Sequence, residues 1–127
     1  MEKFRLLKAA CIIFVVCAAT AIGSAAQTFT VFHNFDGTDG AAPFAGLVQA
    51  ADGNFYGTTS GGGASSICHG LTPPGCGTVF QITPSGTLTV LHSFNNTDGA
   101  APLARLVQAT DGNFYGTTEA GHNVLRQ

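Results

Sequence analysis

Aspartates followed by glycine are the most conspicuous candidates for chemistry in this chain. Every aspartate is followed by a glycine, at positions 36, 39, 52, 98 and 111. Paired carboxylates could act as acid and base on a glycosidic bond, or could bind calcium. The Asp-Gly pair is also what tight turns require, since aspartate accepts hydrogen bonds from nearby backbone and glycine adopts positive φ angles. We predict a turn-forming role for Asp39, Gly40, Asp52, Gly53, Asp98, Gly99, Asp111 and Gly112.

Histidines and aromatic residues are the next candidates. His33 and His92 occupy equivalent places on the apolar face of two similar segments, where a histidine is usually a hydrogen-bonded core residue. Metal ligation would need further ligands close by. Tyr56 and Tyr115 each follow a phenylalanine and could stack on sugar rings, so they are the predicted ligand contacts. No catalytic, cofactor-binding or metal-binding residue is predicted.

Two cysteines, Cys68 and Cys76, lie in a glycine-rich loop. The other two, Cys11 and Cys17, fall in the segment that we expect to be removed on export. An even number of cysteines in an exported protein favours a disulfide, which would stabilise the fold by roughly 2 to 3 kcal/mol through the small loop that it closes. A metal site would require more ligands than two cysteines and His69.

The first 26 residues have the pattern of a secretory signal peptide. Basic residues in positions 1–8 precede an uncharged apolar run, 9–26, which ends in Ser-Ala-Ala. We predict cleavage after residue 26 and export to the extracellular space, the cell surface or the periplasm. A retained anchor is an alternative, although the apolar centre is short for a membrane span. Lipid attachment at Cys17 is a second alternative.

The charge pattern beyond the signal excludes a nucleic-acid binder. Only two basic residues, Arg105 and Arg126, follow residue 26, against five aspartates and Glu119. A nucleic-acid-binding protein needs a cationic face that displaces counterions from the phosphates. We therefore expect a protein or polysaccharide ligand.

An internal repeat is the main signal in the sequence. The segment Thr28–Thr59 returns as Thr87–Thr118 at an offset of 59 residues, with 24 of 32 positions identical. Its apolar residues alternate or form short runs bounded by Gly, Pro, Asp and Asn, which is typical of strands. Asp-Gly and Pro-Ser-Gly sequences supply the hairpin turns. The expected strands of the unit are Gly46–Ala50, Asn54–Thr59, Gly77–Thr83 and Thr87–Phe94.

Two hairpins repeated head to tail predict an all-β fold of four-stranded antiparallel units that resemble propeller blades. A β-solenoid or a sandwich is the alternative. Residues 27–45 would hold the last strand of a preceding unit, with Thr28–Phe35 as that strand, 46–105 one full unit, and 106–127 the first hairpin of a following, truncated unit. Repeat units normally need about three copies for stability, so we expect self-association through open strand edges.

Four motifs resemble those of a known family. They are Gly-Leu-Val-Gln-Ala from residue 46, Asp-Gly-Asn-Phe-Tyr-Gly-Thr-Thr from 52, Gly-Thr-Val-Phe-Gln-Ile-Thr-Pro-Ser-Gly from 77 and Asp-Gly-Ala-Ala-Pro from 39. Together they resemble the bacterial GloVer tandem repeat of choice-of-anchor proteins. The resemblance implies an exported protein with many propeller-like repeats, often held by a separate C-terminal anchor and without an established activity. Arg105 departs from the motif, since the first copy has glycine there.

These observations favour a non-catalytic secreted or cell-surface repeat protein with a binding or structural role and no cofactor. Two alternatives stay open. One is a propeller-type polysaccharide hydrolase or lyase whose site draws one residue from each of several blades. The other is a truncated gene product without a function of its own.

Overall fold

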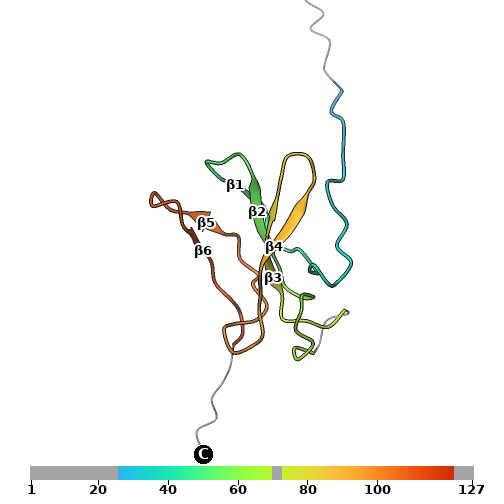
Figure 1. Ribbon diagram of the computed structural model, residues 1–127, viewed down its shortest axis with the longest axis vertical. Helices are drawn as coiled ribbons and strands as arrows, with labels where there is room; N and C mark the ends of the chain where they lie inside the picture. The colour runs from blue at the N-terminus through green and yellow to red at the C-terminus, as the bar shows by residue number, and fades with distance from the viewer. Residues whose placement is uncertain (1–25, 70–72, 122–127) are drawn as a thin grey trace, which may run out of the picture. The chain divides into compact units, whose positions relative to one another are not determined.

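A computed structural model describes residues 26–69 and 73–121 of the chain, and these residues are all-β (Figure 1). They contain no α-helix, and hence no helix that could cross a membrane. The elements described below all belong to the compact unit that begins at Val31. The predicted signal peptide, residues 1–26, lies outside the described residues except for its last position.

The main element is a four-stranded antiparallel sheet in the order β1-β2-β3-β4, which confirms the predicted four-stranded unit. Its strands are β1 (Val48–Gln49), β2 (Phe55–Thr59), β3 (Thr78–Ile82) and β4 (Leu88–Ser93). Each strand pairs with its sequence neighbour because tight turns connect β1 to β2 and β3 to β4. Gly53 and Gly86 take φ angles of 83° and 92° in these turns, a region that glycine enters without strain.

A second, two-stranded sheet repeats the first hairpin. It consists of β5 (Val107–Gln108) and β6 (Phe114–Tyr115). The register is the same in both copies, because Val48 pairs with Tyr56 as Val107 pairs with Tyr115. Neither sheet closes into a barrel.

The two copies of the sequence Asn-Phe-Tyr-Gly-Thr-Thr differ in the length of strand they form. In the first copy β2 runs for five residues, whereas β6 in the second runs for two. The difference follows from the neighbours, since β2 has β3 along its second edge and no strand among the described residues pairs with that edge of β6. Thr59 is accordingly fully buried, and its counterpart Thr118 is exposed.

A hydrophobic core lies where the two copies meet. Ala50 and Tyr56 of the first copy and Leu106 of the second form its buried centre. The ring of Tyr56 stacks on the ring of Phe114, with centroids 4.1 Å apart. The backbone N–H of Ala51 also donates a hydrogen bond to the Gln108 side chain, at 3.1 Å. Each copy therefore buries its apolar surface against its neighbour, as repeat proteins do.

The other face of the four-stranded sheet carries Phe80, which is 3% exposed. Its ring contacts the ring of Phe35 edge-on, with centroids 5.2 Å apart. Gly57 lies directly beneath it, and a Cβ atom added there would stand 2.7 Å from Phe80 Cζ and 2.7 Å from Leu47 Cδ2. The glycine of the repeated motif is thus required by a close approach of side chains.

One expected strand differs in the structure. Thr28–Phe35 forms no strand, although its counterpart Thr87–Phe94 contains β4. A strand needs a hydrogen-bonded neighbour, and β4 obtains one from β3. Thr28–Phe35 has no such partner among the described residues.

Candidate functional site

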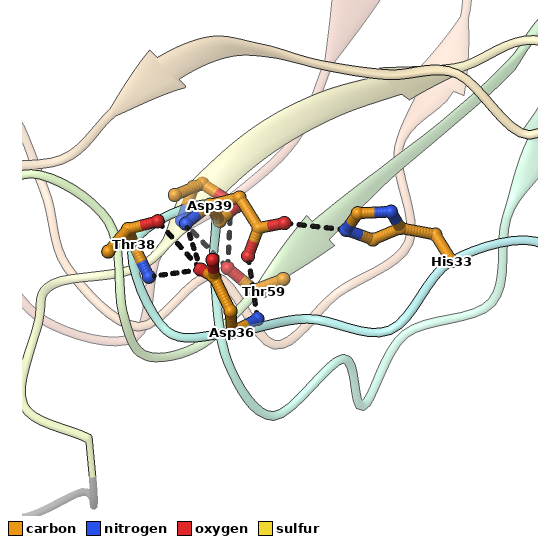
Figure 2. Close-up of polar contacts among 6 residues, drawn as sticks. His33, Asp36, Thr38, Asp39 and Thr59 are labelled. Carbon is orange, nitrogen blue, oxygen red and sulfur yellow. Dashed lines mark hydrogen bonds and ion pairs between the residues drawn. The ribbon is translucent and has the colours of Figure 1, made fainter.

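A histidine and two aspartates meet at the loop that precedes β1. The Nε2 atom of His33 lies 2.5 Å from Oδ2 of Asp39, and Oδ1 of the same carboxylate accepts a hydrogen bond from the backbone N–H of Asp36, at 3.0 Å. Figure 2 shows the histidine approaching the carboxylate from one side and the turn from the other. The Asp39 carboxylate therefore joins the turn to the His33 side chain. We define this cluster, with Thr38, as the His-Asp turn.

The second copy repeats this arrangement. His92 Nε2 lies 2.8 Å from Asp98 Oδ2, and Asp98 Oδ1 accepts a 3.0 Å hydrogen bond from the backbone N–H of Asn95. That backbone N–H, and then the His92 side chain, lower the pKa of Asp98 below its ordinary value. The histidine and aspartate side chains here are 47% and 36% exposed, so solvent reaches both of them.

Asp36 and its counterpart Asn95 show what the first residue of the turn contributes. Asp36 Oδ1 accepts hydrogen bonds from the hydroxyl and the backbone N–H of Thr38, at 2.6 and 2.8 Å, and the hydroxyl is the main reason why the pKa of Asp36 is lowered. Asn95 Oδ1 accepts the same two bonds from Thr97, at 2.5 and 3.0 Å. An amide thus replaces the carboxylate and keeps both bonds to the threonine, because these bonds use one oxygen and do not require its charge. Asp36 Oδ1 also accepts a longer bond, at 3.4 Å, from the backbone N–H of Asp39, for which Asn95 has no equivalent among the described residues.

The loop is fastened to the sheet by two buried threonines. Thr59 and Thr78 have 0% exposure, and their hydroxyl oxygens lie 2.7 Å apart. Thr78 Oγ1 donates to the backbone oxygen of Asp39 at 3.2 Å. A Cβ atom on Gly40 would stand 2.6 Å from Thr59 Cγ2, and the φ angle of Gly40 is 137°, so only glycine fits at this contact.

Backbone pairing completes the attachment in both copies. Ala41 exchanges two hydrogen bonds with Gly61, and Ala100 exchanges two with Ala120. The following alanines, Ala42 and Ala101, have φ angles of 54° and 51°, a left-handed conformation that is uncommon for alanine. The left-handed conformation recurs in both copies, so the loop has a defined structure. It joins the start of a unit to the end of its first hairpin.

The hairpin turns hold the remaining aspartates. Asp52 accepts hydrogen bonds from the Asn54 backbone at 3.0 Å and from the Tyr56 hydroxyl at 2.7 Å. The Tyr56 hydroxyl is the main cause of the lowered pKa of Asp52, and the carboxylate in turn raises the pKa of Tyr56. Asp111 makes the equivalent bonds, to Asn113 at 2.9 Å and to Tyr115 at 3.0 Å, and its pKa is lowered chiefly by the Asn113 backbone N–H.

The two tyrosines predicted as ligand contacts have different surroundings. Tyr56 is 9% exposed, because its ring lies in the core and its hydroxyl bonds to Asp52 and to Gln81. Tyr115 is 56% exposed. Of the two tyrosines, only Tyr115 is therefore exposed enough to stack on a sugar ring. Tyr56 is buried because it packs against Phe114 of the second copy.

The predicted disulfide between Cys68 and Cys76 is confirmed, with the two Cα atoms 5.0 Å apart. Cys76 is 1% exposed, and its carbonyl oxygen accepts a 2.9 Å hydrogen bond from the backbone N–H of Ala101. The disulfide loop thus contacts the second copy directly. Within residues 26–69 and 73–121, no group of three or more histidine, cysteine, aspartate or glutamate side chains could hold a metal ion.

Sequence reasoning did not predict the pairing of histidine with aspartate. The signal was present, because a histidine precedes an aspartate by six residues in both copies. The left-handed alanines were not predicted either, and alanine carries no local signal for that conformation.

The duplicated hairpin, the duplicated loop attachment and the core between the copies define a tandem β-repeat protein. A family model described as the Gloeobacter/Verrucomicrobia repeat matches residues 18–125. The chain belongs to this family, which confirms the resemblance to the GloVer repeat. No significant match was found among curated proteins or among solved structures.

Proposed function

We propose that this chain is a non-catalytic, secreted or cell-surface repeat protein whose units bind a protein or polysaccharide partner. One observation carries the proposal. The aspartates that could act on a glycosidic bond are engaged in turns, and at the first position of the His-Asp turn an asparagine makes the same two bonds to the threonine as the aspartate. Catalysis by a carboxylate depends on its charge or its proton, whereas a turn depends only on its oxygen.

Two features support export. The apolar run of residues 9–26 has the composition of a signal peptide. The Cys68–Cys76 disulfide is compatible with an extracellular or periplasmic location, since disulfides persist in oxidising compartments.

The binding role is supported by surfaces that stand apart from the turns. Tyr115 exposes its ring, and β6 has an edge without a strand partner among the described residues. Exposed strand edges pair with other chains, which is also the basis of the proposed self-association. The propeller-like arrangement of successive units accords with the antiparallel order of the four-stranded sheet.

The test is an activity and binding assay on the mature chain with a panel of polysaccharides. The proposal predicts retention on at least one immobilised polysaccharide or surface protein, without release of reducing ends or unsaturated sugars. A Tyr115→Ala variant tests the exposed ring, and Asp36→Asn is its silent control, because the second copy already has asparagine there. Cleavage of any polysaccharide that is abolished by His92→Ala would overturn the proposal in favour of a hydrolase or lyase.

A further inference from the structure

The outer edge of β6 has no strand partner among the described residues, whereas that of β2 pairs with β3. Along β2, the residues Phe55, Gly57 and Thr59 face Ile82, Phe80 and Thr78 of β3. The corresponding residues of the second copy, Phe114, Gly116 and Thr118, have no strand beside them among the described residues, and Gly116 to Thr118 are exposed. Their backbone hydrogen-bonding groups are therefore available to an added strand.

A pocket adjoins this edge at the place that corresponds to the Phe80 ring. It has a volume of about 300 Å³, and its lining includes Phe94, Pro102, Leu106 and Gly116. The equivalent residues of the first copy, which are Phe35, Pro43, Leu47 and Gly57, all lie around Phe80.

The surroundings of Gly57 and Gly116 show that the pocket corresponds to the site of the Phe80 ring. A Cβ atom on Gly57 would meet Leu47 Cδ2 and Phe80 Cζ, each at 2.7 Å. A Cβ atom on Gly116 would meet Leu106 Cδ2, also at 2.7 Å, and no aromatic ring. The second copy has thus retained the glycine that admits a phenylalanine ring, together with the leucine beneath it.

We infer that the edge of β6 and this pocket form an acceptor groove for an extended peptide strand of the β3 type. The strand would pair with Phe114–Thr118 and place a phenylalanine over Gly116 and beside Phe94, as Phe80 lies over Gly57 and beside Phe35. Backbone bonds supply part of the affinity, and the aromatic anchor supplies the specificity. The inference rests on the proposed binding role and names the partner's chemistry.

The test uses a labelled synthetic peptide with the sequence of residues 77–85, titrated into the mature chain and followed by fluorescence anisotropy. The expected result is saturable one-to-one binding that becomes weaker by about tenfold or more when the peptide carries Phe80→Ala. A Gly116→Ala protein should lose a similar factor while its circular dichroism is unchanged. A Thr110→Val protein is the matched control, because this exposed residue lies in the same hairpin but outside the groove.

Equal affinity for the two peptides, or no saturable binding, would overturn the inference. Sedimentation of the chain with and without peptide gives a second criterion. A dimer that saturating peptide dissociates supports the groove, because the second copy and the peptide then compete for the same edge, whereas a dimer that persists while no peptide is bound would overturn the inference. If the peptide does not bind, the groove is refuted, but polysaccharide binding by the chain is unaffected. If the chain cleaves a polysaccharide, the proposed function is refuted, but peptide binding is unaffected. The two experiments therefore distinguish failure of the groove from failure of the proposed function.

Discussion

Gly57→Ala and Gly116→Ala are the same substitution in the same sequence, Asn-Phe-Tyr-Gly-Thr-Thr. The structure predicts that they lower the free energy of unfolding by different amounts. At either site the new methyl group meets the tip of a leucine at 2.7 Å. Only at Gly57 does it also meet Phe80, whose ring is 3% exposed and in contact with Phe35. Overpacking against a buried side chain costs about 1 to 3 kcal/mol.

The gain from restricting the unfolded chain, about 0.4 to 1 kcal/mol for Gly to Ala, is common to both variants and cancels in the comparison. Neither glycine has a positive φ angle, so alanine is not strained at either site. We therefore expect the free energy of unfolding of the Gly57→Ala variant to be about 1 to 3 kcal/mol lower than that of the Gly116→Ala variant. Urea denaturation followed by circular dichroism measures the difference. Equal free energies for the two variants would refute the reasoning, because β2 and β6 would then share one environment.

Three further predictions follow from the hydrogen bonds and the disulfide. Thr59→Val should lower the free energy of unfolding by about 1 to 3 kcal/mol, measured in urea, since it removes the buried hydroxyl that bonds to the Thr78 hydroxyl and accepts from the Thr78 N–H, and Thr118→Val should lower it by less than about 0.5 kcal/mol; equal costs would contradict this. Reduction of the disulfide should lower the free energy of unfolding by about 2 to 3 kcal/mol, and mass spectrometry after alkylation without reductant should show no added groups. The pKa values of four turn aspartates are lower in the folded chain than in the unfolded chain, so their stabilisation is complete above about pH 5 and is lost as the pH falls through the folded pKa values. A melting temperature that stays constant from neutral pH to about pH 2 would exclude this contribution.

The strands of the full unit were predictable because their signals are local. Alternating apolar residues and the Asp-Gly and Pro-Ser-Gly turns specify hairpins whose strands are adjacent in sequence, and β1 to β4 form as expected within one or two residues at each end. The disulfide was predictable from two cysteines in one loop.

The features that sequence reasoning did not predict all depend on neighbours. The same six residues form a long strand beside β3 and a short one without it, and Thr28–Phe35 forms none. The burial of Tyr56 depends on Phe114 of the other copy, which no local pattern specifies. In a repeat protein the packing of one unit is decided by the next, so a residue's exposure cannot be deduced from its own unit alone.

Neighbouring strands, and not the repeated sequence itself, determine the structure of each copy. Hydrogen exchange measured by nuclear magnetic resonance tests it on residues 57–59 and 116–118, which have the same sequence, Gly-Thr-Thr. We expect slow exchange of the backbone amides in the first set, which pairs with β3, and fast exchange in the second. Equal protection of the two sets would contradict it.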